Sequence, residues 1–417
     1  MQAPVRARGI GEGRPPDFAP VRAQQKLTIT YPPGEQSIRH KIMKNWTAKW
    51  IGIPGRCMVD IRRRTLPAPE FRRCFVPERD IDEAVLFVSG LGYFECRING
   101  RAVSEDLLVP SPTQYDLRWR YLCYKLDFPL LKGQKYLFSI TLGNGLYNCQ
   151  TKDVRWHFFM ANWRDYPKML LQLEDGAGNV LLCSDSKWVT AFSATQYDSF
   201  RGGEIYDARK ELPFSLDEPE ADYVPHTENW PRDEEVKDNA WHHAWIVAPP
   251  GGVGVKQEFS GCRIQERIEM RETSPGVWVS PINAAGLPEI SVQGEAGAVV
   301  KMTCGERLNA EGTAVDNRAI GAYTPEDEPF QQDTYILKGN AMETWRPRFT
   351  FHGFQFVQVE CTGNVEVKGV RQLVIYTGFA KRGGITTSDV RLKKLEECAM
   401  RACRSNFCGF PTDCPHR

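Results

Sequence analysis

The sequence predicts a mainly β protein in which two or more antiparallel β-sandwich domains are followed by an amphipathic helix. Between residues 26 and 375, short apolar or alternating runs recur, separated by turn residues such as Gly, Asn and Pro. A Pro-Pro-Gly-Gly stretch at 249–252 interrupts this pattern, and helical spacing of apolar residues appears only after residue 383. These observations predict two β domains and a change to helical structure near the C-terminus.

The N-terminal segment is predicted to contain a leader and then the first strands. Residues 1–25 are rich in Pro, Gly and Arg and are expected to be disordered, whereas residues 26–70 are expected to form leading strands. This segment shows no apolar signal-peptide core, so we expect a cytoplasmic protein. A misassigned start would hide an export signal, so periplasmic and secreted locations stay open.

The first sandwich is predicted over residues 71–248. Its strand signals are the runs at 85–88, 93–98, 136–142, 169–173 and 180–183. Asn99-Gly100 follows the second of these runs directly, and this dipeptide tolerates the positive φ angles of a two-residue hairpin turn. Short strands at this spacing are typical of antiparallel sandwiches.

The second sandwich is predicted over residues 249–375 and begins at the Pro-Pro-Gly-Gly stretch. Pro cannot donate a ladder hydrogen bond and Gly loosens the backbone, so a domain boundary is expected near residue 250. The strand signals beyond it are the runs at 277–279, 290–292, 299–303, 334–337 and 349–359. In the last run the apolar phase changes at His352-Gly353, which predicts a β-bulge at Gly353.

Residues 376–417 are predicted to contain one helix and a loop. Ser388-Asp389 can cap the helix N-terminus, and Pro411 and Pro415 end the helical region. The helix carries one apolar stripe, formed by Leu392, Leu395, Ala399 and Ala402. This stripe must pack either on the second sandwich or inside a further domain of which the helix is the first element.

Composition and charge exclude several classes of partner. The 417 residues include 53 Lys and Arg against 52 Asp and Glu, so no strong field is available to hold a nucleic acid. The sequence contains no run of 18 apolar residues, so no membrane span is predicted. The 13 cysteines are scattered without a CxxC pair, which argues against a zinc ribbon and predicts small buried residues in a reducing compartment.

A search for catalytic motifs finds no complete active site. The sequence has no GxSxG, HExxH, P-loop or GxGxxG pattern. His242-His243 would point to opposite faces of a strand and make a poor metal site, so no metal site is predicted. Most of the acidic residues that could serve a glycosidase are expected to be solvated loop charges, among them Asp316, Glu326, Asp327, Glu328 and Asp333.

Aromatic residues are dense in one part of the first sandwich. They are Tyr115, Trp119, Tyr121, Tyr147, Trp156 and Trp163. Aromatic faces can stack on sugar rings, and the same side chains also fill sandwich cores. The core interpretation is favoured, and sugar binding is the alternative.

Eight local motifs follow one another from about residue 46 to the end of the chain. The first four are Trp46-Thr47-Ala48-Lys49-Trp50-Ile51-Gly52, Gly92-Tyr93-Phe94-Glu95 with Ile98-Asn99-Gly100, Gly143-Asn144-Gly145-Leu146-Tyr147, and Gly203-Glu204-Ile205-Tyr206-Asp207-Ala208-Arg209. The last four are Glu306-Arg307-Leu308-Asn309 with Gly312, Asp333-Thr334-Tyr335-Ile336-Leu337-Lys338-Gly339, Pro347-Arg348-Phe349-Thr350-Phe351-His352-Gly353-Phe354, and Arg404-Ser405-Asn406-Phe407 with Pro411-Thr412-Asp413-Cys414-Pro415-His416-Arg417. In this order they resemble the motifs of the bacterial α-L-rhamnosidases of glycoside hydrolase family 78.

The resemblance implies an (α/α)₆ barrel after the sandwiches, of which this chain would hold only the first helix and loop. Family members remove terminal α-L-rhamnose from glycosides or polysaccharides with inversion, using one carboxylic acid to protonate the leaving oxygen and a second carboxylate to activate water. The motif places the general acid just after Arg417 and the base further downstream. The chain thus resembles the family without either catalytic carboxylate, and we expect it to be an inactive fragment.

Two site residues carry over through the last motif. Asp413 matches the Asp that binds rhamnose hydroxyls where cleavage occurs, and Arg417 matches the Arg beside the general acid, with a positional or sugar-contacting role. His416 replaces a Gln of the family motif, and Asn144 replaces an Asp. Some related rhamnose-binding modules use Asp/Asn turns to hold calcium, so calcium at Asn144 is an alternative to a plain turn, and no other cofactor is expected.

A different class of function stays open at this point: a stand-alone, non-catalytic carbohydrate-binding β-sandwich protein. The Thr-Asp-Cys-Pro-His-Arg end and the helix with its apolar stripe favour the enzyme fragment. A structural or adhesive surface protein is disfavoured, because the sequence shows neither a signal peptide nor a repeat.

Overall fold

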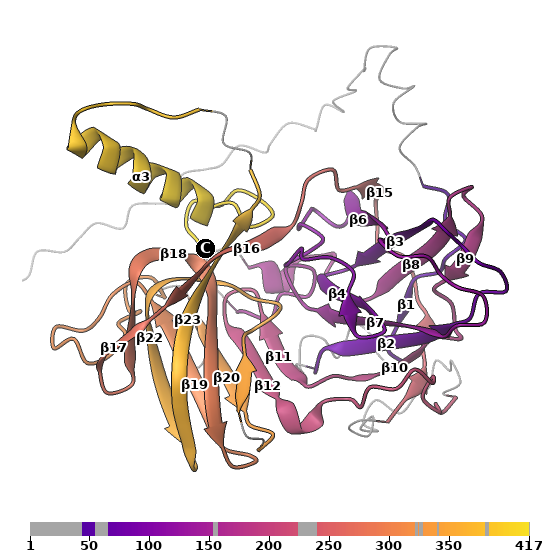
Figure 1. The fold of residues 1–417 in the computed structure, drawn as a ribbon, viewed down its shortest axis with the longest axis horizontal. Helices are drawn as coiled ribbons and strands as arrows, with labels where there is room; N and C mark the ends of the chain where they lie inside the picture. The colour runs from indigo at the N-terminus through magenta and orange to yellow at the C-terminus, as the bar shows by residue number, and fades with distance from the viewer. Residues whose placement is uncertain are drawn as a thin grey trace, which may run out of the picture. The chain divides into compact units, whose positions relative to one another are not determined.

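The computed structural model describes most of the chain, and this part is mainly β, as the sequence predicts (Figure 1). The described residues are 44–54, 66–152, 157–223, 240–321, 324, 328–339, 342–379 and 383–416. Predicted features outside them are the leader at 1–25, the larger part of the leading strands at 26–70, Trp156, Glu326, Asp327 and Arg417. Among the described helices, none has the length and apolar character that a membrane span requires.

Two sheets make up the first sandwich within the described residues. One has seven strands, namely β14 (Trp245–Ile246), β1 (Ile51–Gly52), β8 (Met169–Asp175), β3 (Ala84–Gly90), β6 (Arg118–Lys125) and β15 (Val253–Lys256) in this order, with β9 (Val180–Cys183) beside β8. The other has six strands in the order β13 (His242–His243), β10 (Val189–Phe192), β2 (Pro69–Phe75), β7 (Tyr136–Gly143), β4 (Tyr93–Ile98) and β5 (Arg101–Ala102).

Apolar side chains from both sheets form the core of the first sandwich. Leu86 and Leu171 from the seven-stranded sheet and Phe138 from the six-stranded sheet are completely buried in it. Burying one such side chain contributes roughly 1.5–3 kcal/mol. The predicted hairpin turn is confirmed, because Asn99 and Gly100 have φ angles of 50° and 79° and the strands β4 and β5 pair on either side of them.

A single ten-stranded sheet forms the second sandwich within the described residues. Its order is β11 (Thr195–Ser199), β12 (Gly203–Asp207), β20 (Gln332–Ile336), β19 (Val299–Gly305), β22 (His352–Thr362), β18 (Val277–Gly294), β23 (Val365–Thr377) and β16 (Cys262–Glu269), with β17 (Arg271–Ser274) and β21 (Glu343–Trp345) beside β18. Most strand pairs are antiparallel, as predicted, whereas β12–β20 and β6–β15 are parallel.

Strand β18 allows one sheet to surround a core. Its first half pairs with β22 and its second half with β21, and the register shifts between Val279 and Ala284. Extra residues on one strand bend it, so the two halves can belong to different faces of the sandwich. Ile290, Val300 and Phe354 are completely buried in the resulting core.

The predicted bulge at Gly353 is wrong. Strand β22 begins at His352, so Phe349 and Phe351 lie in the preceding loop and the change of apolar phase marks the start of the strand. Gly353 pairs with Ala285, and the ladder irregularity lies further along, on the β18 side. The glycine is needed for close packing instead, because an added Cβ would lie 2.9 Å from Pro415 Cβ.

Strand pairing crosses the predicted boundary near residue 250 in both directions. Strands β11 and β12 precede it, yet they join the ten-stranded sheet because β12 pairs with β20. Strand β15 follows it, yet it pairs with β6 of the first sandwich. The sequence limits of the two domains, at residues 71, 249 and 376, stay predictions.

The predicted C-terminal helix is α3 (Val390–Ser405). Its N-cap is Asp389, whose side chain accepts the Arg391 backbone N–H at 2.8 Å, as expected from the sequence. Two short 3₁₀ helices occur elsewhere, η1 (Phe158–Met160) and η2 (Ala208–Lys210).

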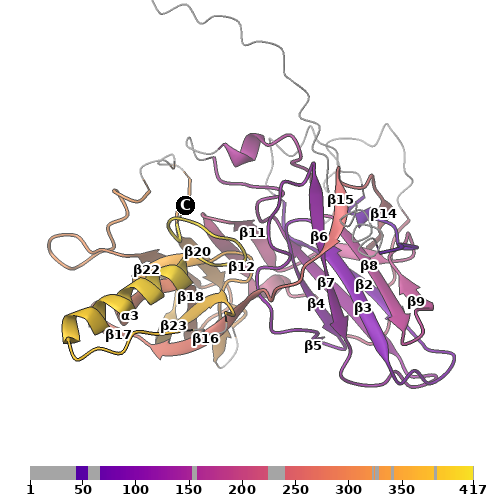
Figure 2. The same ribbon diagram turned by 90° about the horizontal axis from the view of Figure 1, so that it is seen from above.

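The apolar stripe of α3 is not buried on the second sandwich. Leu392 is 51% exposed and Leu395 is 65% exposed. The helix contacts β18 and β23, and at its last residue the Ser405 hydroxyl accepts the Ala285 backbone N–H at 3.1 Å (Figures 1 and 2). The sandwich therefore holds the C-terminal end of α3 and leaves its apolar stripe open.

Candidate functional site

The residues after α3 form a loop that is fixed to strand β23. The Thr377 backbone N–H donates to Phe407 O at 2.7 Å, and the Gly409 N–H donates to the Thr377 hydroxyl at 2.8 Å. Cys408 between them is buried in an apolar cluster with Ile375. These contacts give the loop backbone one defined position on the sandwich.

Asp413, which the motif predicts to bind the sugar, lies exposed on this loop. The preceding Thr412 N–H donates to Asn406 O at 2.9 Å, so the backbone beside Asp413 is held in place. Arg417, the second residue of the predicted sugar site, lies outside the described residues. The sugar-binding roles of both residues stay predictions.

Cavities lie next to α3. One of about 410 Å³ is lined by residues of α3, β18 and β23, including Ile282, Tyr376 and Met400. Another of about 300 Å³ lies between α3, Glu306 and Pro415 of the C-terminal loop. Because sandwich interiors are normally close-packed, these spaces show that the helix is incompletely packed on the sheet.

The Gly-Asn-Gly turn at 143–145 is part of a buried hydrogen-bond network. The Asn144 N–H and Nδ2 donate to the Asp198 carboxylate at 2.7 and 2.9 Å, and Asn144 Oδ1 accepts from Asn148 Nδ2 at 2.7 Å. Burial raises the pKa of Asp198 to about 8. Calcium needs about six to eight oxygen ligands, whereas these oxygens already accept N–H donors, so the arrangement does not fit the calcium alternative.

A second buried carboxylate, Glu204 on β12, holds the loop before β22. Its Oε2 accepts the backbone N–H groups of Arg348 and Phe349 at 2.7 and 3.1 Å. The Arg348 guanidinium donates to the Thr195 hydroxyl at 2.7 Å and lies 3.5 Å from the Glu95 carboxylate on β4. Burial raises the pKa of Glu204, and the Arg348 charge opposes this shift.

A third buried carboxylate corrects a prediction. Asp333 is completely buried on β20 and is no solvated loop charge, because its side chain points into the sandwich. It lies 2.8 Å from His352 Nε2 and accepts the Glu204 backbone N–H at 2.8 Å. We refer to Asp198, Glu204, Asp333, Arg348 and their hydrogen-bond partners as the polar junction.

Cys304, Asp333 and His352 bring together three metal-ligating residue types. Their candidate ligand atoms lie within 4.8 Å of one another, and all three side chains are completely buried. Asp333 and His352 are already hydrogen-bonded to each other, and burial raises the pKa of the Cys304 thiol well above its usual value. With a protonated thiol, the cluster works as a hydrogen-bonded part of the core.

The aromatic residues of the first sandwich are core residues, as favoured from the sequence. Tyr115, Trp119, Tyr121 and Tyr147 are at most 7% exposed. The rings of Tyr115 and Tyr147 pack edge to face at 5.0 Å, and Trp163 packs against the same cluster. These five side chains offer no exposed platform for a sugar ring, which weakens the alternative of a stand-alone carbohydrate-binding protein.

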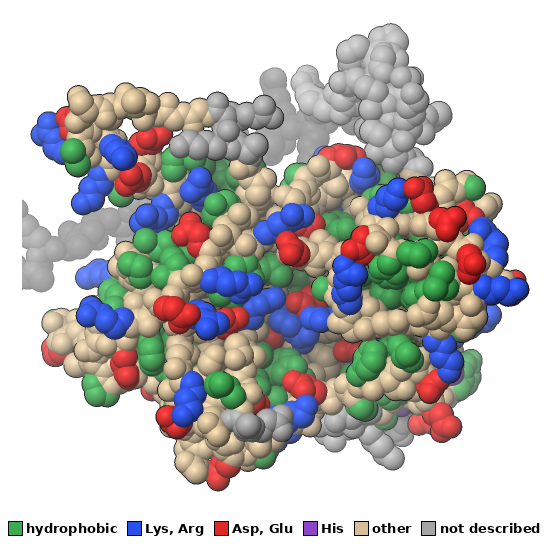
Figure 3. Space-filling view, in the orientation of Figure 1, with side chains coloured by type: hydrophobic (Ala, Val, Ile, Leu, Met, Phe, Trp, Pro, Cys, Tyr) green, Lys and Arg blue, Asp and Glu red, His purple; other side chains and the backbone are tan. Residues whose placement is uncertain are grey.

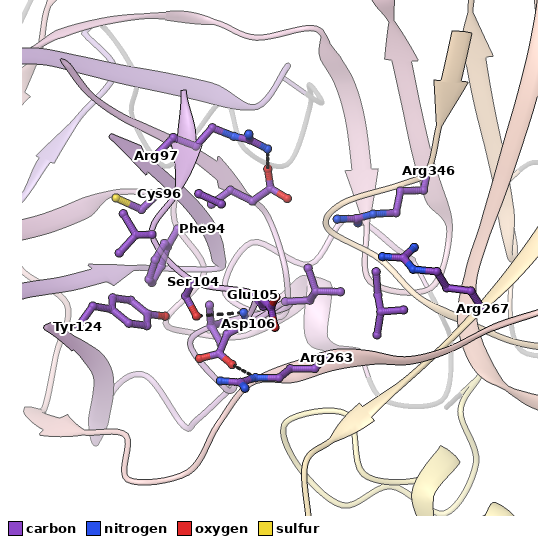
Figure 4. Close-up of a pocket in the computed structure, with 16 residues that line it drawn as sticks. Phe94, Cys96, Arg97, Ser104, Glu105, Asp106, Tyr124, Arg263, Arg267 and Arg346 are labelled. Carbon is purple, nitrogen blue, oxygen red and sulfur yellow. Dashed lines mark hydrogen bonds and ion pairs between the residues drawn. The ribbon is translucent and has the colours of Figure 1, made fainter. Parts of the chain in front are cut away.

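A charged cavity of about 290 Å³ lies beside β4, β16 and residues 103–109 (Figure 4). Its charged lining residues are Glu95, Arg97, Glu105, Asp106, Arg263, Arg267 and Arg346. The sequence analysis missed this site, because its residues come from four separate stretches of the chain, around 94–109, 124, 263–267 and 346. Apart from Phe94 and Glu95, they lie outside the motifs.

Two consecutive β-sandwich domains that share buried polar contacts define a multidomain sandwich protein. Two family models match it, the α-L-rhamnosidase N-terminal domain at residues 79–266 and the bacterial α-L-rhamnosidase concanavalin-like domain at residues 272–376. The chain belongs to this family, as its motifs predict: it carries the N-terminal and concanavalin-like domains of the α-L-rhamnosidases of glycoside hydrolase family 78.

Relatives and solved structures agree with this assignment. Curated α-L-rhamnosidases of Formosa agariphila and Streptomyces avermitilis are 26% and 29% identical over 89% and 84% of this chain. The structure of the enzyme from Dictyoglumus thermophilum matches 89% of this chain and 40% of its own at 27% identity and a TM-score of 0.69. The Streptomyces avermitilis enzyme, solved in complex with L-rhamnose, matches 85% of this chain and 33% of its own at 28% identity and a TM-score of 0.69. The chain spans 40% and 32% of the lengths of the two curated relatives.

The motifs predict the family but not what their residues do. Glu204 and Arg348 belong to different motifs and meet in the structure, and so do Asp333 and His352, whose motifs are also different. One signal for burial is present in the sequence: Glu204 and Asp333 stand in strand-like runs, where a charged residue facing the core needs a partner.

Proposed function

We propose that these domains belong to an enzyme that removes terminal α-L-rhamnose from glycosides or polysaccharides with inversion. Family membership and the L-rhamnose complex of the Streptomyces avermitilis relative support the choice of sugar. The observation that carries the proposal is the exposed stripe of α3 next to the fixed loop with Asp413. Covering such an apolar stripe with a further element is favourable, and the other helices of an (α/α)₆ barrel would cover it.

The reaction requires two carboxyl groups that reach the substrate. Asp198, Glu204 and Asp333 are the completely buried carboxylates among the described residues, and all three accept hydrogen bonds from protein donors inside the sandwiches. Buried in this way, they cannot protonate a glycosidic oxygen. Following the resemblance of the last motif to the family, we place the acid just after Arg417 and the base further downstream, so we expect the 417-residue chain to be inactive by itself.

Asp413 is proposed to accept hydrogen bonds from rhamnose hydroxyls, and Arg417 to contact the sugar or the general acid. A carboxylate on a fixed backbone suits this role, because its geometry is set before the sugar arrives. Hydrogen bonds from hydroxyls to a carboxylate are stronger than those between neutral groups. The sandwiches would then position the loop at the sugar pocket.

The first test measures p-nitrophenol release from p-nitrophenyl α-L-rhamnoside. The 417-residue chain is expected to release none above the buffer blank, whereas the natural full-length protein is expected to release it. Turnover by the 417-residue chain would contradict the placement of the carboxylates, and a full-length protein without activity would contradict the proposed reaction.

The second test addresses Asp413 in the full-length protein. Asp413→Asn is expected to lower kcat/KM by roughly 10–100-fold, because a charged hydrogen bond to the sugar is lost. Asp127→Asn is the matched control, since Asp127 is exposed in the first sandwich and only pairs with Arg101. Equal kinetics of the two variants would contradict a sugar-binding role for Asp413.

A further inference from the structure

The charged cavity opens to solvent on the face shown in Figure 3, where Lys and Arg side chains gather around β16 with a few Asp and Glu among them. Arg97, Glu105, Arg263 and Arg267 on its rim are exposed, whereas Phe94 and Val109 at its base are buried. The cavity is therefore accessible to a solute and has apolar as well as charged walls.

The carboxylates of this cavity do not neutralise all of its arginines. Glu95 lies 3.6 Å from Arg97 and also contacts Arg348. Asp106 lies 2.8 Å from Arg263. These two carboxylates are thereby already used by arginines other than Arg267 and Arg346.

Arg267 and Arg346 have no carboxylate partner within ion-pair distance in the described part of the chain. Figure 4 shows both side chains entering from the same side and pointing into the cavity. Glu105 is the remaining acidic residue of the lining, and it also forms no ion pair with a described residue. The lining thus carries four arginines against three acidic residues and keeps a net positive charge.

The partly buried charge of Arg346 is incompletely compensated in this cavity. Its guanidinium donates one hydrogen bond, to Pro347 O at 3.0 Å. Burial lowers the pKa of Arg346, and Glu95 only partly opposes this shift. A partly buried cation without a paired anion is unfavourable, so an anion bound in the cavity would stabilise it.

We propose that this cavity binds the carboxylate of an acidic monosaccharide, a hexuronate unit of a glycan, through Arg267 and Arg346. Planar guanidinium groups match a carboxylate through paired hydrogen bonds. A cavity of about 290 Å³ has room for one sugar ring. The choice of a sugar as the carrier of the carboxylate rests on the proposed function, which makes this an accessory site for acidic glycans.

The test is calorimetric titration of the 417-residue chain with D-glucuronate. We expect a Kd on the order of 1 mM, as suits a ligand of this size, and no binding of D-glucose, its neutral counterpart. Acetate and sulfate are the further probes. If acetate bound as tightly as glucuronate, the proposed recognition of the sugar ring would be contradicted. If sulfate bound as tightly, the proposed selectivity for a carboxylate would be contradicted.

Variants locate the site. Arg267→Gln and Arg346→Gln are each expected to weaken glucuronate binding at least about tenfold, and Glu105→Gln to strengthen it about twofold to threefold, because a like charge is removed. Arg318→Gln is the control, since Arg318 is exposed on a loop and pairs only with Asp316. Arg267 is exposed, so its replacement leaves the fold intact even if Arg346→Gln does not.

No glucuronate binding, or binding that Arg267→Gln leaves unchanged, would overturn the proposal. Because the readout is binding by the 417-residue chain, it is independent of rhamnoside hydrolysis. Failure of the hydrolysis test and failure of this one can therefore be told apart.

Discussion

The polar junction and the helix α3 differ in how completely the protein buries their side chains. In the junction, Glu204 is completely buried and accepts hydrogen bonds from two backbone N–H groups and the Thr195 hydroxyl. In α3, Leu392 and Leu395 are more than half exposed. The comparison teaches that the sandwiches hold the junction carboxylates in buried hydrogen bonds, whereas the helix presents an apolar surface that they do not cover.

The largest expected effect comes from breaking the junction. Arg348→Leu leaves Glu204 without its cation and Glu95 with Arg97 alone. An uncompensated buried charge lowers the free energy of unfolding by about 3–5 kcal/mol. Urea denaturation followed by circular dichroism measures this. The control Arg318→Leu, at an exposed ion pair, is expected to change stability by less than about 1 kcal/mol. A loss below about 1 kcal/mol in Arg348→Leu would show that the junction is not tightly coupled.

The next effect is a pH dependence of stability to which the junction contributes. Burial raises the pKa of Asp198 to about 8, so the folded state binds a proton that the unfolded chain releases near pH 4. Stability from this group is full below pH 4 and is lost as the pH rises through 8. Between pH 6.5 and 8.5 the loss is about 2 kcal/mol by linkage, and Glu204, whose pKa is also raised, acts in the same direction.

Asp198→Asn is expected to reduce this fall in stability, measured as the urea midpoint at pH 6.5 and 8.5. Asp316→Asn is the control, because an ion pair with Arg318 lowers the pKa of Asp316 and it does not titrate in this window. His242 has a lowered pKa, so its contribution has the opposite sign and is complete about one pH unit above the ordinary value of 6.5. An unchanged slope in Asp198→Asn would rule out its titration.

A smaller effect concerns the start of the helix. Asp389→Ala removes the N-cap and is expected to cost about 1 kcal/mol locally. Amide hydrogen exchange of the first turn, measured by NMR, should then be roughly fivefold faster. Asp389→Asn keeps a capping oxygen and should exchange like the wild type. Equal rates for the Ala and wild-type proteins would mean that the first turn is held by other contacts.

The smallest effect is expected on the exposed stripe of α3. Leu395→Gln should change the free energy of unfolding by less than about 0.5 kcal/mol, because little apolar surface is buried there. Leu373→Ala, at a buried position of β23, should cost about 2–5 kcal/mol in the same assay. If Leu395→Gln destabilised the chain as strongly, the contrast between the two regions would fail.

Local sequence signals predicted much of the fold. The Asn99-Gly100 turn forms because only a few residues tolerate two positive φ angles in succession. Asp389 caps α3 because its side chain reaches an unpaired N–H within two residues. Both features depend on neighbours in the chain, so the sequence is sufficient to find them.

Features that depend on distant residues were missed or misplaced. Asp333 looked like a loop charge, because nothing near it in the sequence indicates that His352 will pair with it. The charged cavity draws Arg267 and Arg346 to one place although 79 positions separate them in the numbering. Within the candidate site, Asp413 followed from a motif, while the loop contacts that hold its backbone came only from the structure.

The sequence by itself determined the fold class, the family and the helix with its cap, because periodicity, turn chemistry and ordered motifs are properties of short segments. The tertiary structure decided which strands share a sheet, which carboxylates are buried, and that the stripe of α3 stays open. These depend on contacts between residues far apart in the chain, whose energies arise only when the fold brings them together.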